Sequence, residues 1–201
     1  MATRKKGKPR SGKNTKKRQK PSGNRVTLII DTALELVSQS GWRSLTLAGI
    51  AERTGLGLAE IRVLYPCKAM ILNGLISRID EQILVDKDAE GDNIRDRLFD
   101  LLMRRFDALD HNKTAIAAIA REAWCDPAAA LITGPRMLVS MHWMLEAAGA
   151  PSTGLMGAAR CKVLGLIYAN AFRVWLNDDS ADMGPTMAAL DQGLRQAERF
   201  E

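Results

Sequence analysis

The stretch from Thr46 to Pro66 constrains the fold more than any other part of the chain, because it predicts two short helices joined by a tight turn. Thr46 is placed to cap the first helix with its hydroxyl, and Gly55 can supply the left-handed backbone that ends it. Pro66 then stops the second helix. Two short helices joined by a glycine-bearing turn form the helix-turn-helix pattern, whose second helix can lie in the major groove of DNA.

Helical spacing continues on both sides of this stretch and predicts an all-α protein. Residues 25–70 are expected to form a three-helix DNA-binding head, and residues 71–201 a helical domain for ligand binding and dimerisation. In the second domain, Gly134 and Pro135 should break or kink a helix that begins near Pro127. The segment 153–177 is apolar nearly all round, so it should be covered on several sides. Together with the final helix, it is predicted to form the dimer interface.

Charge is concentrated at the N-terminus. Residues 1–24 contain ten Lys or Arg and no acid, and almost nothing apolar, so we expect a disordered basic tail. The whole chain has 29 basic and 23 acidic side chains, which leaves 19 basic against 23 acidic ones in residues 25–201. Attraction to polyanions therefore lies mostly in the tail, and two interpretations remain open: an arm that binds DNA phosphates, or a solubilising segment.

The region from Leu28 to Leu75 resembles the DNA-binding domain of TetR-type transcriptional regulators. The matching pieces are A-L-E-L at 33–36, G-W at 41–42, T-L-x-x-I-A-E-R-T-G-L at 46–56 and Y-P-x-K at 65–68. The resemblance implies a TetR-like fold, a homodimer, double-stranded DNA as partner and a small-molecule effector. The second helix departs from the family pattern, because Gly57 and Leu58 stand where a small polar residue and a lysine are usual.

Eight residues are candidates for contact with DNA. Thr46, Arg62 and Lys68 are the best candidates for phosphates. Gly57, Leu58, Ala59 and Val63 are expected to face the groove, where they offer backbone N–H groups and apolar contacts, such as to thymine methyls. The remaining candidate, Glu60, lies on the same short helix and is expected to be solvated or to face phosphates.

A methionine-rich and aromatic set in the second domain predicts a hydrophobic ligand site, the alternative being an ordinary core with a dimer seam. The candidate ligand-binding residues are Trp124, Met137, Met141, Met144, Tyr168, Phe172 and Trp175. A second resemblance covers the C-terminal two-thirds: W-M-L-E-A-A-G-A at 143–150, Y-A-N-A-F at 168–172 and W-L-N-D-D-S-A-D-M at 175–183 are similar to the lipid-binding proteins of coenzyme Q biosynthesis. Those proteins share the TetR fold without reading DNA.

Signatures of other protein classes are lacking in the sequence. No apolar run reaches the roughly 18 residues that a membrane span needs. Cys67, Cys125 and Cys161 are too far apart for a CxxC site and indicate a reducing compartment. The two histidines, His111 and His142, belong to no catalytic triad or metal motif, so we expect no enzyme, no cofactor and no metal.

These observations predict a cytoplasmic bacterial regulator of the TetR type, associated with the nucleoid when bound to DNA. It would be a repressor that a hydrophobic effector releases from DNA. The alternative is a lipid- or isoprenoid-binding protein of the coenzyme Q type, which keeps the fold without regulating transcription.

Overall fold

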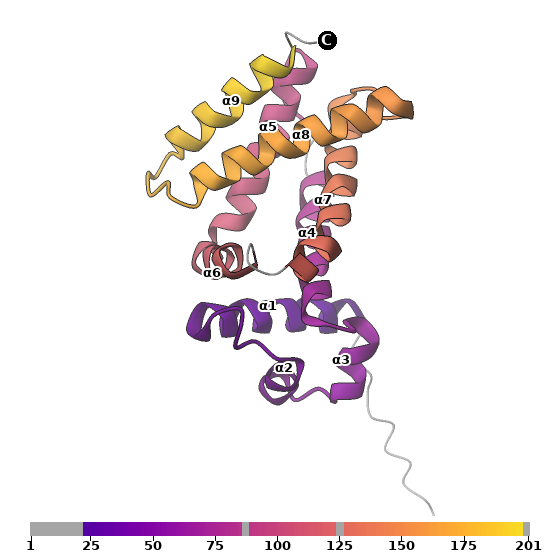
Figure 1. Ribbon diagram of the computed structural model, residues 1–201, viewed down its shortest axis with the longest axis vertical. Coiled ribbons are helices and arrows are strands. Elements are labelled where there is room, and N and C mark those ends of the chain that lie inside the picture. Colours follow the sequence, from indigo (N-terminus) through magenta and orange to yellow (C-terminus); the bar gives the residue numbers. More distant parts are fainter. Residues whose placement is uncertain (1–21, 86–88, 124–126, 199–201) are drawn as a thin grey trace, which may run out of the picture.

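The computed structural model describes residues 22–85, 89–123 and 127–198, and every regular element in these ranges is a helix (Figure 1). The all-α prediction is therefore confirmed. The helices are α1 (Ser22–Ser40), α2 (Leu47–Thr54), α3 (Leu58–Leu64), α4 (Lys68–Val85), α5 (Ile94–Asp110), α6 (Lys113–Ala123), α7 (Pro127–Ala148), α8 (Gly154–Trp175) and α9 (Gly184–Glu198).

Helices α1, α2 and α3 form a small head at one end of the molecule (Figure 1). Its core is apolar and fully closed, since Ile30, Ile50 and Ile61 have no exposed surface and Trp42 is 2% exposed. One residue comes from each of the three helices, and Trp42 from the loop after α1. Burying one apolar stripe from each helix is what stabilises helices too short to persist alone.

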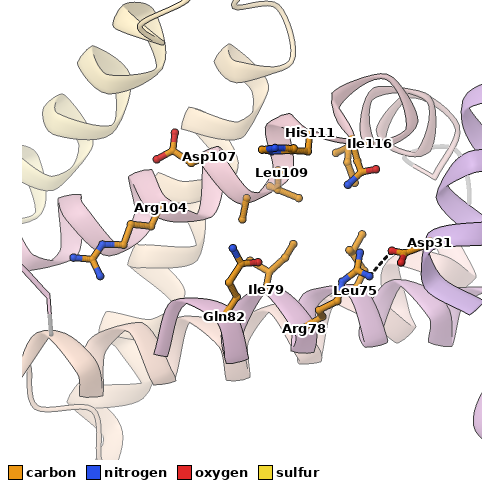
Figure 2. Close-up of a pocket in the computed structure, with 12 residues that line it drawn as sticks. Asp31, Leu75, Arg78, Ile79, Gln82, Arg104, Asp107, Leu109, His111 and Ile116 are labelled. Carbon is orange, nitrogen blue, oxygen red and sulfur yellow. Dashed lines mark hydrogen bonds and ion pairs between the residues drawn. The ribbon is translucent and has the colours of Figure 1, made fainter. Parts of the chain in front are cut away.

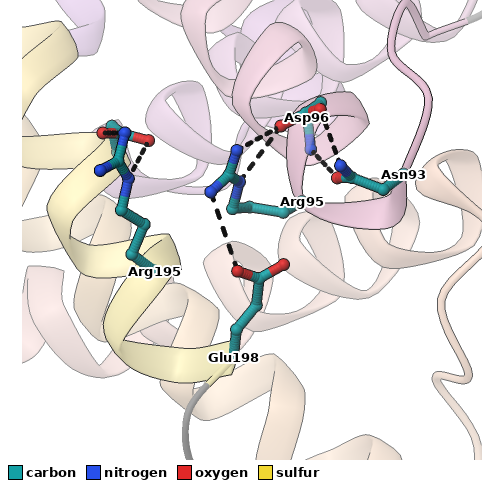
Figure 3. A network of polar contacts seen from close by, with 6 residues as sticks. Asn93, Arg95, Asp96, Arg195 and Glu198 are labelled. Atoms are coloured by element: carbon teal, nitrogen blue, oxygen red, sulfur yellow. Dashed lines mark hydrogen bonds and ion pairs between the residues drawn. The ribbon is translucent and has the colours of Figure 1, made fainter.

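The rest of the chain forms a bundle that α4 joins to the head. In Figure 1, α4 rises from the head alongside α7, while α8 crosses the bundle and α9 runs beside it. Arg95 of α5 forms an ion pair with Glu198 of α9 at 3.8 Å, which joins these two helices (Figure 3). Its guanidinium also pairs with the neighbouring Asp96 at 2.8 Å. The buried aromatic rings of Phe106, Tyr168 and Trp175 fill the space between α5 and α8.

A buried ionic network crosses the bundle near its middle. Asp80 of α4 is 3% exposed and accepts hydrogen bonds from Arg136 Nη2 at 2.5 Å and Ser140 Oγ at 2.6 Å, both on α7. Arg105 of α5, 1% exposed, forms an ion pair with the same carboxylate. Removing one partner of such a network leaves a buried charge without compensation, so Asp80 fixes α4 relative to α5 and α7.

Two sequence predictions about the elements differ from the structure. Helix α1 begins at Ser22, inside the segment predicted as tail; residues 1–21 lie outside the described residues. The predicted break at Gly134–Pro135 is wrong, because α7 continues through both residues. Pro135 is exposed, so its ring projects to solvent while α4 and α8 hold the helix from its other sides. Within the single chain, helix α8 is covered on one side, since Leu155 and Leu166 remain 90% and 72% exposed, and cover of the other side by a partner stays a prediction.

Candidate DNA-binding surface and a neighbouring cavity

The turn between α2 and α3 is built by local capping contacts. Thr46 has an extended backbone (φ −127°, ψ 151°), and its Oγ1 accepts a hydrogen bond from Gly49 N at 3.0 Å. Gly55 ends α2 in the left-handed region (φ 69°), where its N–H donates to Ala51 O at 2.9 Å. A side chain is strained at that φ, which favours glycine. The predicted helix cap and helix stop are both confirmed.

Helix α3 turns one face inward and one face to solvent. Ile61 is fully buried against the head core, and Tyr65 ends the helix in an extended conformation. Glu60 stabilises the first turn, because its carboxylate accepts a hydrogen bond from Gly57 N at 3.1 Å. Arg25 of α1 forms an ion pair with the same carboxylate at 3.4 Å. Glu60 is thus engaged within the head, and the inner face of α3 is fixed by packing.

The outward face of α3 combines apolar side chains with one guanidinium. Leu58 is 51% exposed and Val63 is 79% exposed, although both are apolar. Ala59 and Arg62 are exposed as well, and their three-residue spacing puts them on the same side of the helix. Arg62 forms no hydrogen bond or ion pair with the described residues. Its guanidinium is therefore available to an anion or to a hydrogen-bond acceptor outside the chain.

Two of the predicted phosphate ligands already make contacts inside the head. Thr46 caps α2 with its hydroxyl oxygen, which leaves the O–H free to donate elsewhere. Lys68 Nζ donates to Trp42 O at 3.0 Å and to Arg43 O at 3.5 Å, and lies 4.9 Å from the centroid of the Trp42 ring. These contacts hold the loop after α1 against the start of α4. A phosphate contact by either residue stays a prediction.

The predicted ligand-binding residues lie in the packed interior of the bundle. Met141, Met144 and Trp175 have no exposed surface, and Tyr168 is 4% exposed. Phe172 is half-buried and stacks on Trp175 with ring centroids 5.5 Å apart. Met137 is also half-buried against the core. Trp124 lies outside the described residues. Most of these residues therefore lie together in the hydrophobic core of the bundle. Their role in ligand binding stays a prediction.

Sequence reasoning missed a cavity of about 630 Å³ that lies where the head joins the bundle. Its lining comes from α1, α4, α5, the turn after α5, and α6 (Figure 2). Its buried apolar residues include Leu75 and Ile79 of α4, Leu109 of α5 and Ile116 of α6. Gln82 of α4 points from one wall into the gap. No local pattern in the sequence marks this cavity, because its lining residues belong to segments that only the tertiary fold brings together.

Comparisons with solved structures agree with this geometry. A TetR transcriptional regulator from Nitrosomonas europaea ATCC 19718 is 25% identical, with a TM-score of 0.69 over 88% of this chain and 99% of the other. The chain has the TetR fold. A TetR transcriptional regulator from Rhodococcus sp. RHA1 has a TM-score of 0.65 at 17% identity, covering 87% and 96% of the two chains. No protein-family model matches the sequence, and neither does any of the curated proteins.

Within this TetR fold, the histidines do not assemble a reactive centre among the described residues. His111 lines the cavity, and His142 packs edge-on against Trp143 with ring centroids 6.0 Å apart. The described ranges contain no group of three or more His, Cys, Asp or Glu that could hold a metal ion. None of the described helices is long and apolar enough to cross a membrane.

Proposed function

We propose that this protein is a transcriptional regulator that binds DNA as a homodimer, with α3 in the major groove. The observation that carries the proposal is the outward face of α3, where Arg62 is exposed beside Leu58 and Val63 and has no partner among the residues that the structure describes. A guanidinium in that position can donate two hydrogen bonds to guanine or clamp a phosphate. Apolar neighbours suit thymine methyl groups.

The dimer would be built on the exposed apolar side chains of α7 and α8. Trp143 of α7 is 48% exposed, and Leu155, Met156 and Leu166 of α8 are 90%, 66% and 72% exposed. An exposed apolar patch of this kind marks an interaction site. A second copy related by a two-fold axis would cover it with the same patch. Leu194 of α9 is 4% exposed within its own chain, so this side chain packs inside the protomer, while a contribution of α9 to the interface stays a prediction.

We further propose that the protein is a repressor, released from DNA when an effector binds outside the head, and that it acts in the bacterial cytoplasm at the nucleoid. The effector predicted from the sequence is hydrophobic. Buried side chains such as Met141 and Trp175 fill the region where it was expected. A ligand there has to displace packed side chains, whereas the cavity beside α4 offers open volume lined by both apolar and polar side chains.

The decisive experiment compares DNA binding of the full chain with that of Arg62→Ala on a fragment of its own promoter and on random DNA. Affinity for the promoter should fall about 5- to 150-fold, corresponding to roughly 1–3 kcal/mol for one base contact, and affinity for random DNA should fall less. Folding stability should change by less than about 0.5 kcal/mol, because the side chain is exposed.

The matched control for this experiment is Arg195→Ala. Arg195 is an exposed arginine on α9 that pairs only locally with Asp191 at 2.9 Å. Its replacement should leave both DNA affinities unchanged. If Arg62→Ala and the native chain bind the promoter with equal affinity, the proposal that Arg62 on α3 contacts the DNA is wrong.

A further inference from the structure

The cavity lies between helices of the head and helices of the bundle. Its walls are α4 and α5, and residues of α1 and α6 close one end (Figure 2). Two pairs of these helices pack the head directly against the bundle, α1 with α4 and α1 with α6, and α4 also packs against α5 within the bundle. A molecule bound here would therefore alter the joint itself rather than a distant part of the bundle.

The lining is apolar at the bottom and polar at the edge. Leu75, Ile79, Leu109 and Ile116 are each 7% exposed or less and form the bottom. Polar and charged side chains surround them, among them Gln82. A volume of about 630 Å³ lies within the usual range of roughly 300–1,000 Å³ for small-molecule sites. A lining of this kind suits a ligand with an apolar body and one polar end.

The charges of the lining residues determine whether the polar end of the ligand should be a cation or an anion. Both arginines in the lining are already ion-paired: Arg78 with Asp31 at 2.5 Å, and Arg104 with Asp100 at 2.6 Å. Asp107, also in the lining, has no ion-pair partner among the described residues. Burial raises the pKa of Asp107, and the negative charge of nearby Asp110 raises it further.

Among the residues that the structure describes, no other cation forms an ion pair with Asp107. Lys113 is the nearest lysine in sequence to Asp110, but its ammonium donates to Asp178 O and lies 3.7 Å from Asp179. The uncompensated charge of the cavity is therefore negative.

We propose that this cavity is the effector site and that it binds an organic cation, with an apolar body on Leu75, Ile79 and Ile116 and an ammonium group on Asp107. The regulatory part rests on the proposed function, since it assumes that the head binds DNA. The binding part does not, because it concerns the cavity alone. A cationic amphiphile is also consistent with a hydrophobic effector.

A residue that lines the cavity also acts on Tyr65 at the end of α3, the helix proposed to lie in the DNA groove. Arg78 lines the cavity and pairs with Asp31 of α1. Its charge also acts on Tyr65, the residue that ends α3, since it lowers a pKa that burial raises. Gly74, one turn earlier on α4, packs against the Tyr65 ring. A ligand that displaces α4 would therefore move α3 relative to α1.

The test uses three probes that share a naphthyl ring and differ in charge: naphthylmethylammonium, naphthylmethanol and naphthylacetate. Each is titrated into the full-length chain by calorimetry without DNA. The cation should bind most tightly, and Asp107→Asn should weaken it roughly five-fold while leaving the alcohol unchanged. Asp179→Asn removes another carboxylate, one that lies outside the cavity lining, and should change neither.

A second variant tests the location. Gln82→Trp places an indole in the gap between α4 and α5 and should abolish binding of all three probes without unfolding the chain, because Gln82 is exposed. Tighter binding of naphthylacetate, equal binding of the three probes, or cation binding that survives both Gln82→Trp and Asp107→Asn would each overturn the assignment.

The regulatory part is then measured separately, by fluorescence anisotropy of promoter DNA with the cation present. Release of DNA from the native chain but not from Gln82→Trp is the expected result. Cation binding without release would refute the regulatory link and leave the site intact. Failure of the native chain to bind promoter DNA at all would refute the proposed function instead.

Discussion

Replacing Gly74 of α4 by alanine should displace the end of α3, because the added methyl group would clash with Tyr65. A Cβ at position 74 would lie 2.9 Å from Tyr65 Cε1 and 3.0 Å from Cζ, with the hydroxyl closer still. Ordinary carbon contacts are about 3.5–4.0 Å, so the ring has to move by roughly 0.5–1 Å. Tyr65 is 6% exposed and ends α3, so it cannot move into solvent without moving the helix end.

The expected magnitude is a balance of two effects. Overpacking of this kind costs about 1–3 kcal/mol. Alanine in place of glycine within a helix stabilises the folded state by up to about 1 kcal/mol. The net loss of stability should be roughly 0–2 kcal/mol. Affinity for promoter DNA should fall by about tenfold, equivalent to about 1.4 kcal/mol, because a displaced α3 loses aligned contacts.

A double-mutant cycle with Tyr65→Phe isolates the cause. Removing the hydroxyl removes the closest contact, so Gly74→Ala should cost less in the phenylalanine background, with a coupling of roughly 1 kcal/mol. Urea unfolding measures stability, and anisotropy measures DNA affinity.

Gly134→Ala is the matched control for the cycle. Gly134 lies inside α7, where an added Cβ meets nothing within 4 Å, so alanine there should be neutral or stabilising. If Gly74→Ala behaves like Gly134→Ala in both assays, Tyr65 does not couple α4 to α3.

Three further predictions concern the tail, the dimer and the acid stability. Deleting residues 1–21, which carry ten Lys or Arg, should weaken binding to all DNA and flatten its salt dependence by about 0.9 in log–log slope per lost phosphate contact; an unchanged slope would exclude a DNA-binding arm. Leu166→Glu, on the exposed side of α8, should give a folded monomer by sedimentation, whereas Leu194→Glu should unfold the chain because that side chain is 4% exposed; a dimeric Leu166→Glu protein would place the interface elsewhere. Burial raises the pKa of Asp178, but hydrogen bonds from Ser180 and Thr186 lower it more, to about 2. These hydrogen bonds therefore stabilise the folded state fully above about pH 4, and this stabilisation is lost as the pH falls toward 2. Asp178→Asn should therefore be less stable near pH 7, and a stability difference that does not shrink between pH 4 and 2 would contradict this.

The local elements of the head could be predicted from the sequence because their contacts span few residues. Thr46 caps a helix through Gly49, three residues away, and Gly55 ends it through Ala51, four residues away. Such contacts depend on residue type and spacing alone. The apolar stripe that buries Ile50 and the exposed position of Arg62 follow from the same helical period.

The packing partners of the bundle helices depend on contacts between distant parts of the chain, so they could not be predicted from the sequence. The exposed side of α8 carries large apolar residues such as Leu155 and Leu166, as its buried side does, so the sequence alone does not tell which of them the protomer itself buries. Asp80 meets Arg105 and Arg136 across 25 and 56 residues, and the cavity combines four helices in the same way. Contacts at that separation depend on how the helices pack against one another, a property of the folded chain that no local pattern of residues carries.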